Sequence, residues 1–244
     1  MARSRILRSL QSLLVTTWVT VHAQTFDTAT LDRAKAGDSS AQYEIGRAYQ
    51  GGIGVEKNNE EATQWYRRSA ASGNSSAQYA LALELLYGWG GQRDVREGVS
   101  FLTKAAENDN VTAQMMLGQL YEDGGLGKYV SKDHSDFVDM VPKNDLLAAK
   151  WHRIAANNGN PLSQNHLGDM YLAGRGVPQN YAEAYFWLTL GDAGGVHSTT
   201  DGTDNRDVAS SHLSKAMISA IQNRASEWFK HHPSMNSSGL PTHN

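Results

Sequence analysis

The stretch "AQYEIGRAYQGGIGV", residues 41–55, reads as a helix that runs into glycines. Related stretches begin at Ala77, Ala113 and Ser163, and the first three copies start 36 residues apart. Positions one, five, six and nine carry apolar or small residues, which share one face of a helix turning about 100° per residue. A glycine at position twelve can supply the left-handed turn that ends a helix. It is present in every copy, as Gly52, Gly88, Gly124 and Gly174. The pattern therefore predicts four helices that pack on one side and end at a fixed residue.

A second helix is expected after each of these. It is marked by a bulky pair, found at Trp65-Tyr66, Phe101-Leu102, Trp151-His152 and Trp187-Leu188. Gly73, Gly159 and Gly195 follow this second helix, whereas the second copy has Asp109 instead. One helix pair cannot bury its apolar face alone, so neighbouring pairs must stack into an all-α solenoid. The aromatic pairs are then core residues, and His152, which replaces a tyrosine, is a packed or groove-edge residue.

The whole unit "AQYEIGRAYQGGIGVEKNNEEATQWYRRSAASGN" resembles a Sel1-like repeat, a relative of the tetratricopeptide repeat. The resemblance extends from about residue 27 to 230, beginning with a partial leading unit, "LDRAKAGDSS". A closing helix is expected at residues 213–228, with Ser214 as its N-cap. The repeats are expected at 41–76, 77–112, 113–162 and 163–195, the closing helices at 204–230, and a disordered tail at 231–244. The resemblance implies a right-handed α-solenoid of stacked antiparallel helix pairs. It also implies a non-enzymatic adaptor that binds proteins along a groove and needs no cofactor.

The first 23 residues differ in character from the repeats. Three arginines precede an apolar stretch, Leu10 to Val21, that is short for a membrane span, and Ala23 suits a cleavage site. This pattern predicts a signal peptide, with a membrane anchor as the alternative. Cleavage would leave 19 basic and 25 acidic residues, a formal charge of about −6, in the periplasm or outside the cell.

The absence of cysteine excludes disulfides, thiolate catalysis and thiolate metal sites. No basic field is present that could hold nucleic acid. The partner implied by the family resemblance is a protein, and no stable membrane insertion is expected after signal cleavage. The sequence does not indicate an oligomeric state.

The third copy is 50 residues long, and its extra 14 residues fall within 126–145. Long insertions in solenoids form loops, often on a binding face. We expect this loop to contact the partner. Three aspartates at a spacing of three leave a cation site as an alternative, although they match no defined calcium loop. The loop residues in question are Tyr129, Asp133, His134, Asp136, Phe137, Asp139 and Met140.

The face of the first helices opposite the core holds positions three, four, seven and ten. It carries tyrosines, leucines and methionines among a few charges, a mixture that suits a protein-binding groove. The alternative is that part of this face packs against the neighbouring unit. The predicted groove residues are Tyr43, Glu44, Arg47, Tyr79, Leu83, Met115, Met116, Gln119, His166 and Asp169.

The sequence shows no catalytic motif. No histidine pair has helical zinc-site spacing, and the glycine turns follow helices and lack a phosphate-loop ending. We therefore expect an exported, non-enzymatic binding module. A narrower expectation is an immunity protein that neutralises a phospholipase-type toxin, as some exported Sel1-like proteins do. The alternatives are an envelope or host-interaction scaffold, or a β-lactamase-like or cell-wall hydrolase. The hydrolase alternative is weakened because the β-lactamase-like members carry paired cysteines.

Overall fold

The computed structural model describes residues 27–125, 141–200 and 203–232. The regular structure of the described chain is helical except for one short hairpin. The chain divides into two compact units, with the boundary in the sequence between Arg93 and Asp94. The first unit contains α2 (Thr28–Lys35), α3 (Ser39–Gly51), α4 (Asn59–Ala71) and α5 (Ser75–Tyr87). Consecutive helices of this unit pack against one another.

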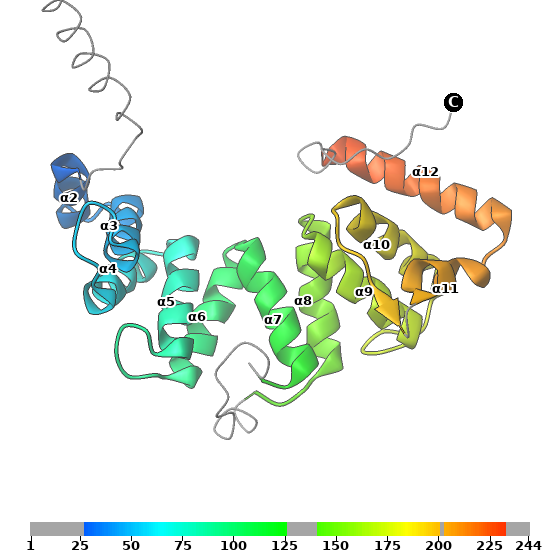
Figure 1. The fold of residues 1–244 in the computed structure, drawn as a ribbon, viewed down its shortest axis with the longest axis horizontal. Helices are drawn as coiled ribbons and strands as arrows, with labels where there is room; N and C mark the ends of the chain where they lie inside the picture. The colour runs from blue at the N-terminus through cyan, green and yellow to red at the C-terminus, as the bar shows by residue number, and fades with distance from the viewer. Residues whose placement is uncertain (1–26, 126–140, 201–202, 233–244) are drawn as a thin grey trace, which may run out of the picture. The chain divides into compact units, whose positions relative to one another are not determined.

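The second unit begins with five helices: α6 (Val95–Glu107), α7 (Val111–Asp123), α8 (Asp145–Asn157), α9 (Pro161–Ala173) and α10 (Tyr181–Ala193). The antiparallel strands β1 (Thr199–Thr200) and β2 (Thr203–Asp204) follow, pairing Thr199 with Asp204 and Thr200 with Thr203. The unit ends with α11 (Asn205–Ser211) and α12 (Lys215–His231). Figure 1 shows α8, α9 and α10 side by side, with α12 beside α10.

The first helix of each repeat begins and ends in the same way. Its N-cap is an aspartate or asparagine whose side chain accepts a hydrogen bond from the N–H three residues on. These caps are Asp38, Asn74, Asn110 and Asn160. Its C-cap is the glycine of position twelve, with φ between 67° and 71° in the left-handed region. The helix ends expected from the repeat are confirmed.

The turn after each second helix also needs a left-handed residue. Glycine supplies it at four places, with φ of 100° at Gly37, 84° at Gly73, 83° at Gly159 and 80° at Gly195. Asp109 adopts the same conformation, with φ of 59°. The second copy therefore keeps the turn without the glycine, since aspartate tolerates this region better than most residues.

The small residue at position six allows close helix packing, as expected. A Cβ atom added to Gly46 would lie 2.5 Å from the Tyr66 ring, and one on Gly168 would lie 2.6 Å from Leu188. Seven of the eight residues in the bulky pairs are buried, whereas Phe101 is half-buried. Tyr66 and Leu102 are fully buried, and Trp65 is 7% exposed.

A polar contact repeats along the chain between the glutamine at position two and the preceding second helix. Gln114 Nε2 donates to the Ala106 carbonyl at 3.0 Å, and three other glutamines make the equivalent bond. The four buried glutamines are Gln42, Gln78, Gln114 and Gln164. Each donates to a carbonyl in the last turn of a helix. At Ala34, Ala70 and Ala156 that carbonyl also accepts from the N–H of the following turn glycine. The glutamine recurs at position two of every copy, but its hydrogen bond was not predicted.

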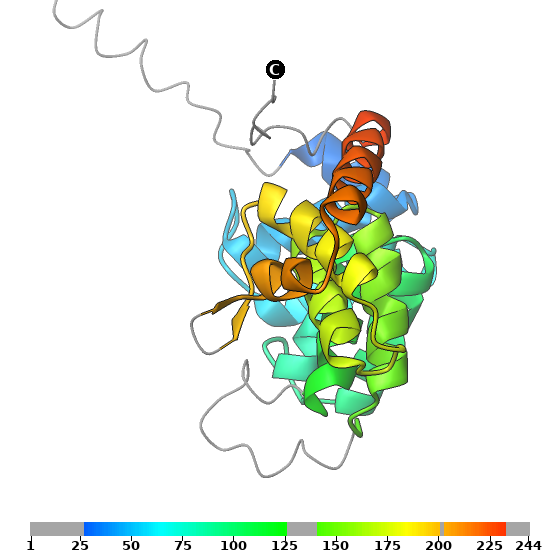
Figure 2. The same cartoon turned by 90° about the vertical axis from the view of Figure 1, so that its right-hand side faces the viewer.

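The C-terminal helices close the core of the second unit. Ile221, Ala225 and Phe229 of α12 are buried in a cluster that includes Leu188 of α10. Figure 2 views this end, with α11 and α12 beside α9 and α10. Ser214 caps α12 as expected, and its Oγ accepts from Met217 N at 3.3 Å. The helix continues to His231, three residues beyond the expected end, so the first residue assigned to the tail belongs to α12.

Candidate partner-binding face and histidine–glutamate cluster

The predicted groove residues of the first unit lie at the surface of α3 and α5. Glu44 and Arg47 are exposed, whereas Tyr43, Tyr79 and Leu83 are half-buried. The Tyr43 ring lies 5.9 Å from the Tyr66 ring, and the Arg47 guanidinium lies over Tyr43 at 6.0 Å. Burial raises the pKa of Tyr79. These residues form a face with aromatic and aliphatic surface and charges close by.

Beside this face, α5 carries a buried carboxylate. Glu84 is 2% exposed, and its Oε1 accepts from Gln50 Nε2 at 2.7 Å, while Oε2 has no hydrogen-bond partner. Gln50 Oε1 in turn accepts from the Tyr66 hydroxyl at 3.0 Å. Burial raises the pKa of Glu84, and the hydrogen bond from Gln50 opposes that effect. Glu84 lines a pocket of about 390 Å³ together with Glu60, Arg67 and others.

An exposed tryptophan follows α5 in the turn "YGWGG". Trp89 is 49% exposed and stacks on Tyr87 with ring centroids 4.7 Å apart. Its neighbours Gly90 and Gly91 line the Glu84 pocket. The sequence analysis missed Trp89, although the signal was present: no other copy places an aromatic side chain between the glycines of this turn.

In the second unit, three predicted groove residues are half-buried on α7: Met115, Met116 and Gln119. Asp169, on α9, already has partners within the unit. It accepts hydrogen bonds from Ser198 Oγ at 2.6 Å and from Asn205 Nδ2 at 2.7 Å, which tie α9 to the hairpin and α11. Asp169 therefore has a structural role beside any contact with a partner.

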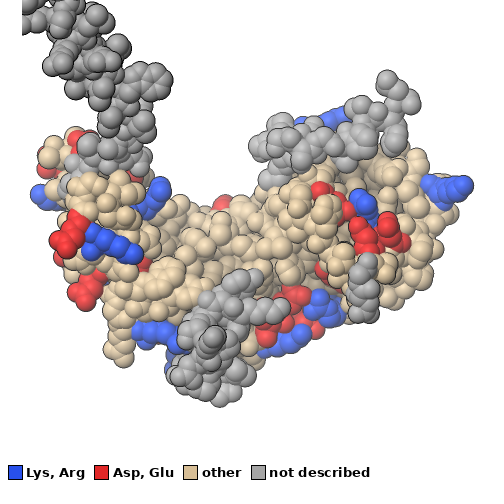
Figure 3. Space-filling model, in the orientation of Figure 1, with Lys and Arg blue, Asp and Glu red and all other residues tan. Residues whose placement is uncertain are grey.

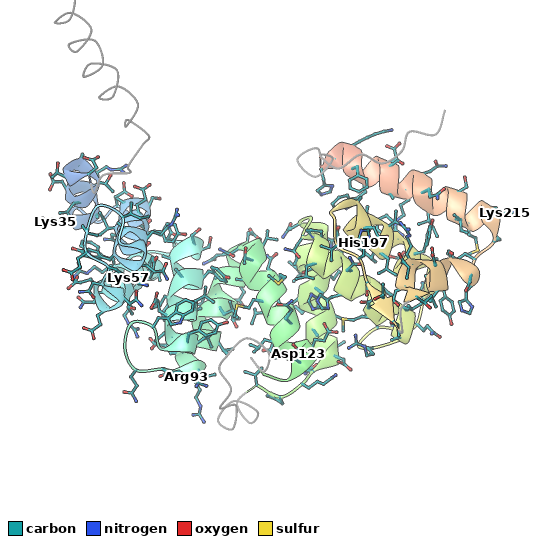
Figure 4. All side chains as sticks on the ribbon, in the orientation of Figure 1. Lys35, Lys57, Arg93, Asp123, His197 and Lys215 are labelled. Atoms are coloured by element: carbon teal, nitrogen blue, oxygen red, sulfur yellow. The ribbon has the colours of Figure 1, made fainter. Side chains whose placement is uncertain are left out.

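His166 belongs to a cluster with Glu122 of α7 and His152 of α8. Glu122 Oε2 lies 2.9 Å from His166 Nδ1 and 3.3 Å from His152 Nε2. The two imidazoles stack with centroids 4.7 Å apart and planes 11° apart. Arg175 Nη2 donates to the other oxygen, Glu122 Oε1, at 2.8 Å. In Figure 4, the label Asp123 marks the end of α7, one residue beyond Glu122.

The cluster is largely withdrawn from water. His152 is fully buried, and Glu122 has 12% of its side chain exposed. Burial raises the pKa of Glu122, but the contacts with His152, His166 and Arg175 outweigh burial and hold it well below its usual range. Burial lowers the pKa of His152 more than Glu122 raises it. Near neutral pH the cluster therefore pairs a carboxylate with a neutral His152.

Ser163 extends the cluster into a serine–histidine–glutamate series, because its Oγ lies 3.4 Å from His152 Nδ1. This order of groups resembles that of a serine hydrolase. However, Ser163 and His152 are both 0% exposed, so a substrate has no access to the hydroxyl. The arrangement does not support a nucleophilic active site. The expectation that His152 is a packed residue is confirmed.

A second group of possible ligands lies after α10, where Asp192, His197 and Asp204 approach one another. Asp192 pairs with Arg206 at 2.8 Å and with His197 at 3.0 Å. His197, labelled in Figure 4, is exposed. On the face of the second unit shown in Figure 3, acidic and basic side chains lie next to one another rather than in fields of one sign. Each carboxylate oxygen of Asp192 thus lies beside a basic side chain.

Several predicted elements lie outside the described residues. They are the signal peptide, the loop residues Tyr129, Asp133, His134, Asp136, Phe137, Asp139 and Met140, and the end of the tail. Among the described residues, no helix is both long and apolar enough to cross a membrane.

Stacked pairs of short helices with glycine turns define a helical repeat protein. The Sel1 repeat family model matches residues 39–74, 75–110, 111–135, 138–160 and 161–191. The chain belongs to the Sel1 repeat family, and the predicted all-α solenoid class is confirmed. No curated protein matched the sequence.

The chain is also similar to solved structures. A Sel1 repeat protein from Oxalobacter formigenes is 28% identical, with a TM-score of 0.58, over 80% of this chain and 47% of that one. The protective antigen c5321 of uropathogenic Escherichia coli is 25% identical (TM-score 0.48; 88% and 52% covered). Immunity protein Pa5087 of Pseudomonas aeruginosa is 19% identical (TM-score 0.40; 86% and 74% covered). The last two likenesses carry no functional information for this chain. It spans about half the length of the first two proteins.

Proposed function

We propose that the chain is an exported, non-enzymatic module that binds one protein partner through the outer face of its first helices. Sel1 repeats mediate protein–protein interactions, and the family is generally non-enzymatic. One observation carries the proposal for this chain. The ten predicted groove residues remain half-buried or exposed, although positions one, five and six of the same helices are buried. The predicted face is smaller than positions three, four, seven and ten imply, because Leu86 at position ten and Asn165 at position three are buried.

The chemistry of the face supports a protein partner. Tyr43, Tyr79 and Met116 offer large side chains that are partly exposed, and such residues are enriched at the centres of interfaces. Trp89 adds an exposed indole, and tryptophan is among the residues that most often dominate binding energy. The formal charge of the chain, −3 in full and more negative without its arginine-rich start, favours a basic partner.

Site-specific photo-cross-linking in cells tests this proposal. A photoreactive amino acid is placed at one of two face positions, Tyr79 or Met115. The matched control places it at Lys104, which is exposed on α6, the second helix of its repeat. We expect the face positions to capture one and the same protein and Lys104 to capture none. The same partner from Lys104, or unrelated proteins from the two face positions, would contradict the proposal.

Purified components provide the second test. A variant with Tyr43, Tyr79 and Met116 changed to lysine should lose the partner while its circular dichroism spectrum and unfolding midpoint stay close to those of the parent. If the folded variant binds with unchanged affinity, the face is not the binding site. Fractionation of cells that express the full chain tests export, since an exported chain is recovered outside the cytoplasm without its first residues.

The narrower proposal is that the partner is a phospholipase-type toxin and the chain is its immunity protein. It rests on the family resemblance and on the expected export. An immunity protein should inhibit its toxin at a one-to-one ratio and protect cells that receive the toxin. Binding without inhibition would instead favour an envelope or host-interaction scaffold.

A further inference from the structure

The third and fourth copies differ from the other copies at residues that lie together in the cluster of Glu122, His152 and His166. Position ten is glutamine in the first copy and glutamate in the third, as Gln50 and Glu122. The second member of the bulky pair is Tyr66 in the first copy and His152 in the third. The fourth copy adds His166 at position four and Ser163 at position one, where the other copies have alanine.

The first copy shows what this place looks like with ordinary residues. There the Tyr66 hydroxyl donates to Gln50 Oε1 at 3.0 Å, and the ring lies against Gly46. In the third copy His152 lies against Gly118 in the same manner, since an added Cβ would lie 2.6 Å from its ring. A neutral hydrogen-bonded pair has thus been replaced by an imidazole and a carboxylate, the side chains that transition metals prefer.

The contacts within the cluster are short, yet they lack the geometry of hydrogen bonds. Glu122 Oε2 lies 3.3 Å from His152 Nε2 and 2.9 Å from His166 Nδ1, but neither Oε2 nor His152 Nε2 has a hydrogen-bond partner. His152 Nε2 is thus fully buried and makes no aligned hydrogen bond, only the 3.3 Å contact with Glu122 Oε2, so a better partner would lower the free energy. The three candidate ligand atoms lie within 4.8 Å of one another. Ligands about 2.0–2.1 Å from a tetrahedral zinc ion lie about 3.3 Å apart, a spacing close to that of the two contacts with Glu122 Oε2. Because the two imidazoles stack with planes 11° apart, a ring must turn for both nitrogens to point at one ion.

Neighbouring groups already hold the cluster as the outer shell of a metal site would. Ser163 Oγ lies 3.4 Å from His152 Nδ1, so it can fix the ring with Nε2 turned to Glu122. Arg175 occupies Glu122 Oε1 and leaves Oε2 to the two imidazoles. The charge of Arg175 is offset by Asp145 at 4.0 Å, which also pairs with Lys143 at 3.7 Å.

We propose that His152 Nε2, His166 Nδ1 and Glu122 Oε2 bind a zinc ion that joins α7, α8 and α9. Two imidazoles and one carboxylate form a ligand set found for zinc, whereas calcium and magnesium prefer oxygen alone. Three protein ligands leave a fourth position for water. His166 also belongs to the proposed partner-binding face, so the two sites share one residue, but the test of the metal site requires no partner.

The test uses the untagged full chain, freed of metal and titrated with zinc sulfate in a calorimeter and with cobalt chloride in a spectrophotometer. We expect one zinc ion per chain and the visible absorption of tetrahedral cobalt, removed by added zinc. The unfolding temperature should rise with zinc concentration, as it does for a ligand that binds only the folded state. Magnesium sulfate should produce none of these changes. If zinc and cobalt do not bind at micromolar concentrations, the cluster is a metal-free network and the proposal is wrong.

Two variants remove the zinc ligands by introducing residues that other copies of the repeat have at the equivalent positions. The pair Glu122→Gln and His152→Tyr recreates the Gln50–Tyr66 contact, and His166→Ala places at position four the alanine that the second copy has as Ala80. Each should fold and lose the zinc heat and the cobalt spectrum. His166→Ala keeps the proposal testable if the double variant does not fold.

Two further variants serve as controls for the source of binding. Histidines near the C-terminus could bind metal by themselves, so His231→Asn with His232→Asn should leave zinc binding unchanged. Ser163→Ala keeps all three ligands and should weaken zinc binding about 10- to 100-fold through loss of the outer-shell contact. Binding that survives His166→Ala but disappears in the double asparagine variant would overturn the assignment.

Discussion

Replacing Gly73 by alanine should destabilise the protein through the backbone alone. Gly73 has φ of 84°, and a Cβ atom added there would have no neighbour within 4 Å. The cost of the left-handed conformation for an L-residue is about 1–2 kcal/mol. The lower entropy of the unfolded alanine chain returns about 0.4–1 kcal/mol. We therefore expect the free energy of unfolding to fall by about 1 kcal/mol.

Asp109 provides the reciprocal change, since it occupies the equivalent turn with φ of 59°. Asp109→Gly should raise the free energy of unfolding by less than about 1 kcal/mol, because aspartate tolerates this region and glycine is more flexible when unfolded. Urea unfolding followed by circular dichroism measures both variants, and an unchanged slope shows that the states compared are the same. Gly37→Ala, at φ of 100° and also without a neighbour within 4 Å, is the matched control and should behave like Gly73→Ala. Equal stability of the parent and both alanine variants would refute the reasoning.

Three further predictions concern single side chains. Gln114→Met should lower the free energy of unfolding by about 1–3 kcal/mol, which urea unfolding measures. It removes both the donor to the buried Ala106 carbonyl and the acceptor of the hydrogen bond from Asn158 Nδ2. Glu84→Gln should stabilise the protein near pH 7 but not below the unfolded pKa. Because the pKa of Glu84 is raised in the folded chain, the folded state holds the Glu84 proton more tightly than the unfolded state. The stability of the parent therefore falls as the pH rises from the unfolded pKa to the folded pKa. Unfolding free energies of parent and variant that run parallel from pH 4 to 8 would contradict this prediction. Trp89→Ala should weaken partner binding about tenfold or more without changing stability, and calorimetry with the purified partner would refute this if affinity is unchanged.

Much of the fold could be predicted because the same local sequence pattern occurs in all four repeats. Glycine at position twelve, a small residue at position six and a bulky pair in the second helix each leave a periodic signal, so the helix ends and the core could be assigned. Asp109 shows the limit of such rules. Asp109 departs from the glycine pattern, yet its backbone has φ of 59°. The turn requires a left-handed backbone conformation, and more than one residue type can adopt it.

The His152 cluster could not be predicted in the same way. Its members come from α7, α8 and α9, and the search for histidines at helical spacing could not bring them together. Glu122 and His166 are 44 residues apart. Their proximity follows from the stacking of helices, so it depends on tertiary structure rather than on local sequence. The available signal was the replacement of a repeat tyrosine by His152, which the sequence analysis explained by packing alone.

If zinc binds at the proposed site, the helices that carry its ligands should be stabilised more than the rest of the chain. A chain without cysteine has no disulfide to limit its unfolded states, and a metal that joins Glu122 to His166 would close a long loop instead. Hydrogen exchange of the full chain with and without zinc should therefore show slower exchange in α7, α8 and α9. Exchange in α3 and α4, which have no proposed ligand, should change little, because helical repeats couple mainly to their neighbours. Equal slowing of α3 and α9 would indicate metal bound elsewhere, and no change in α7 to α9 at saturating zinc would show that the cluster does not hold the ion.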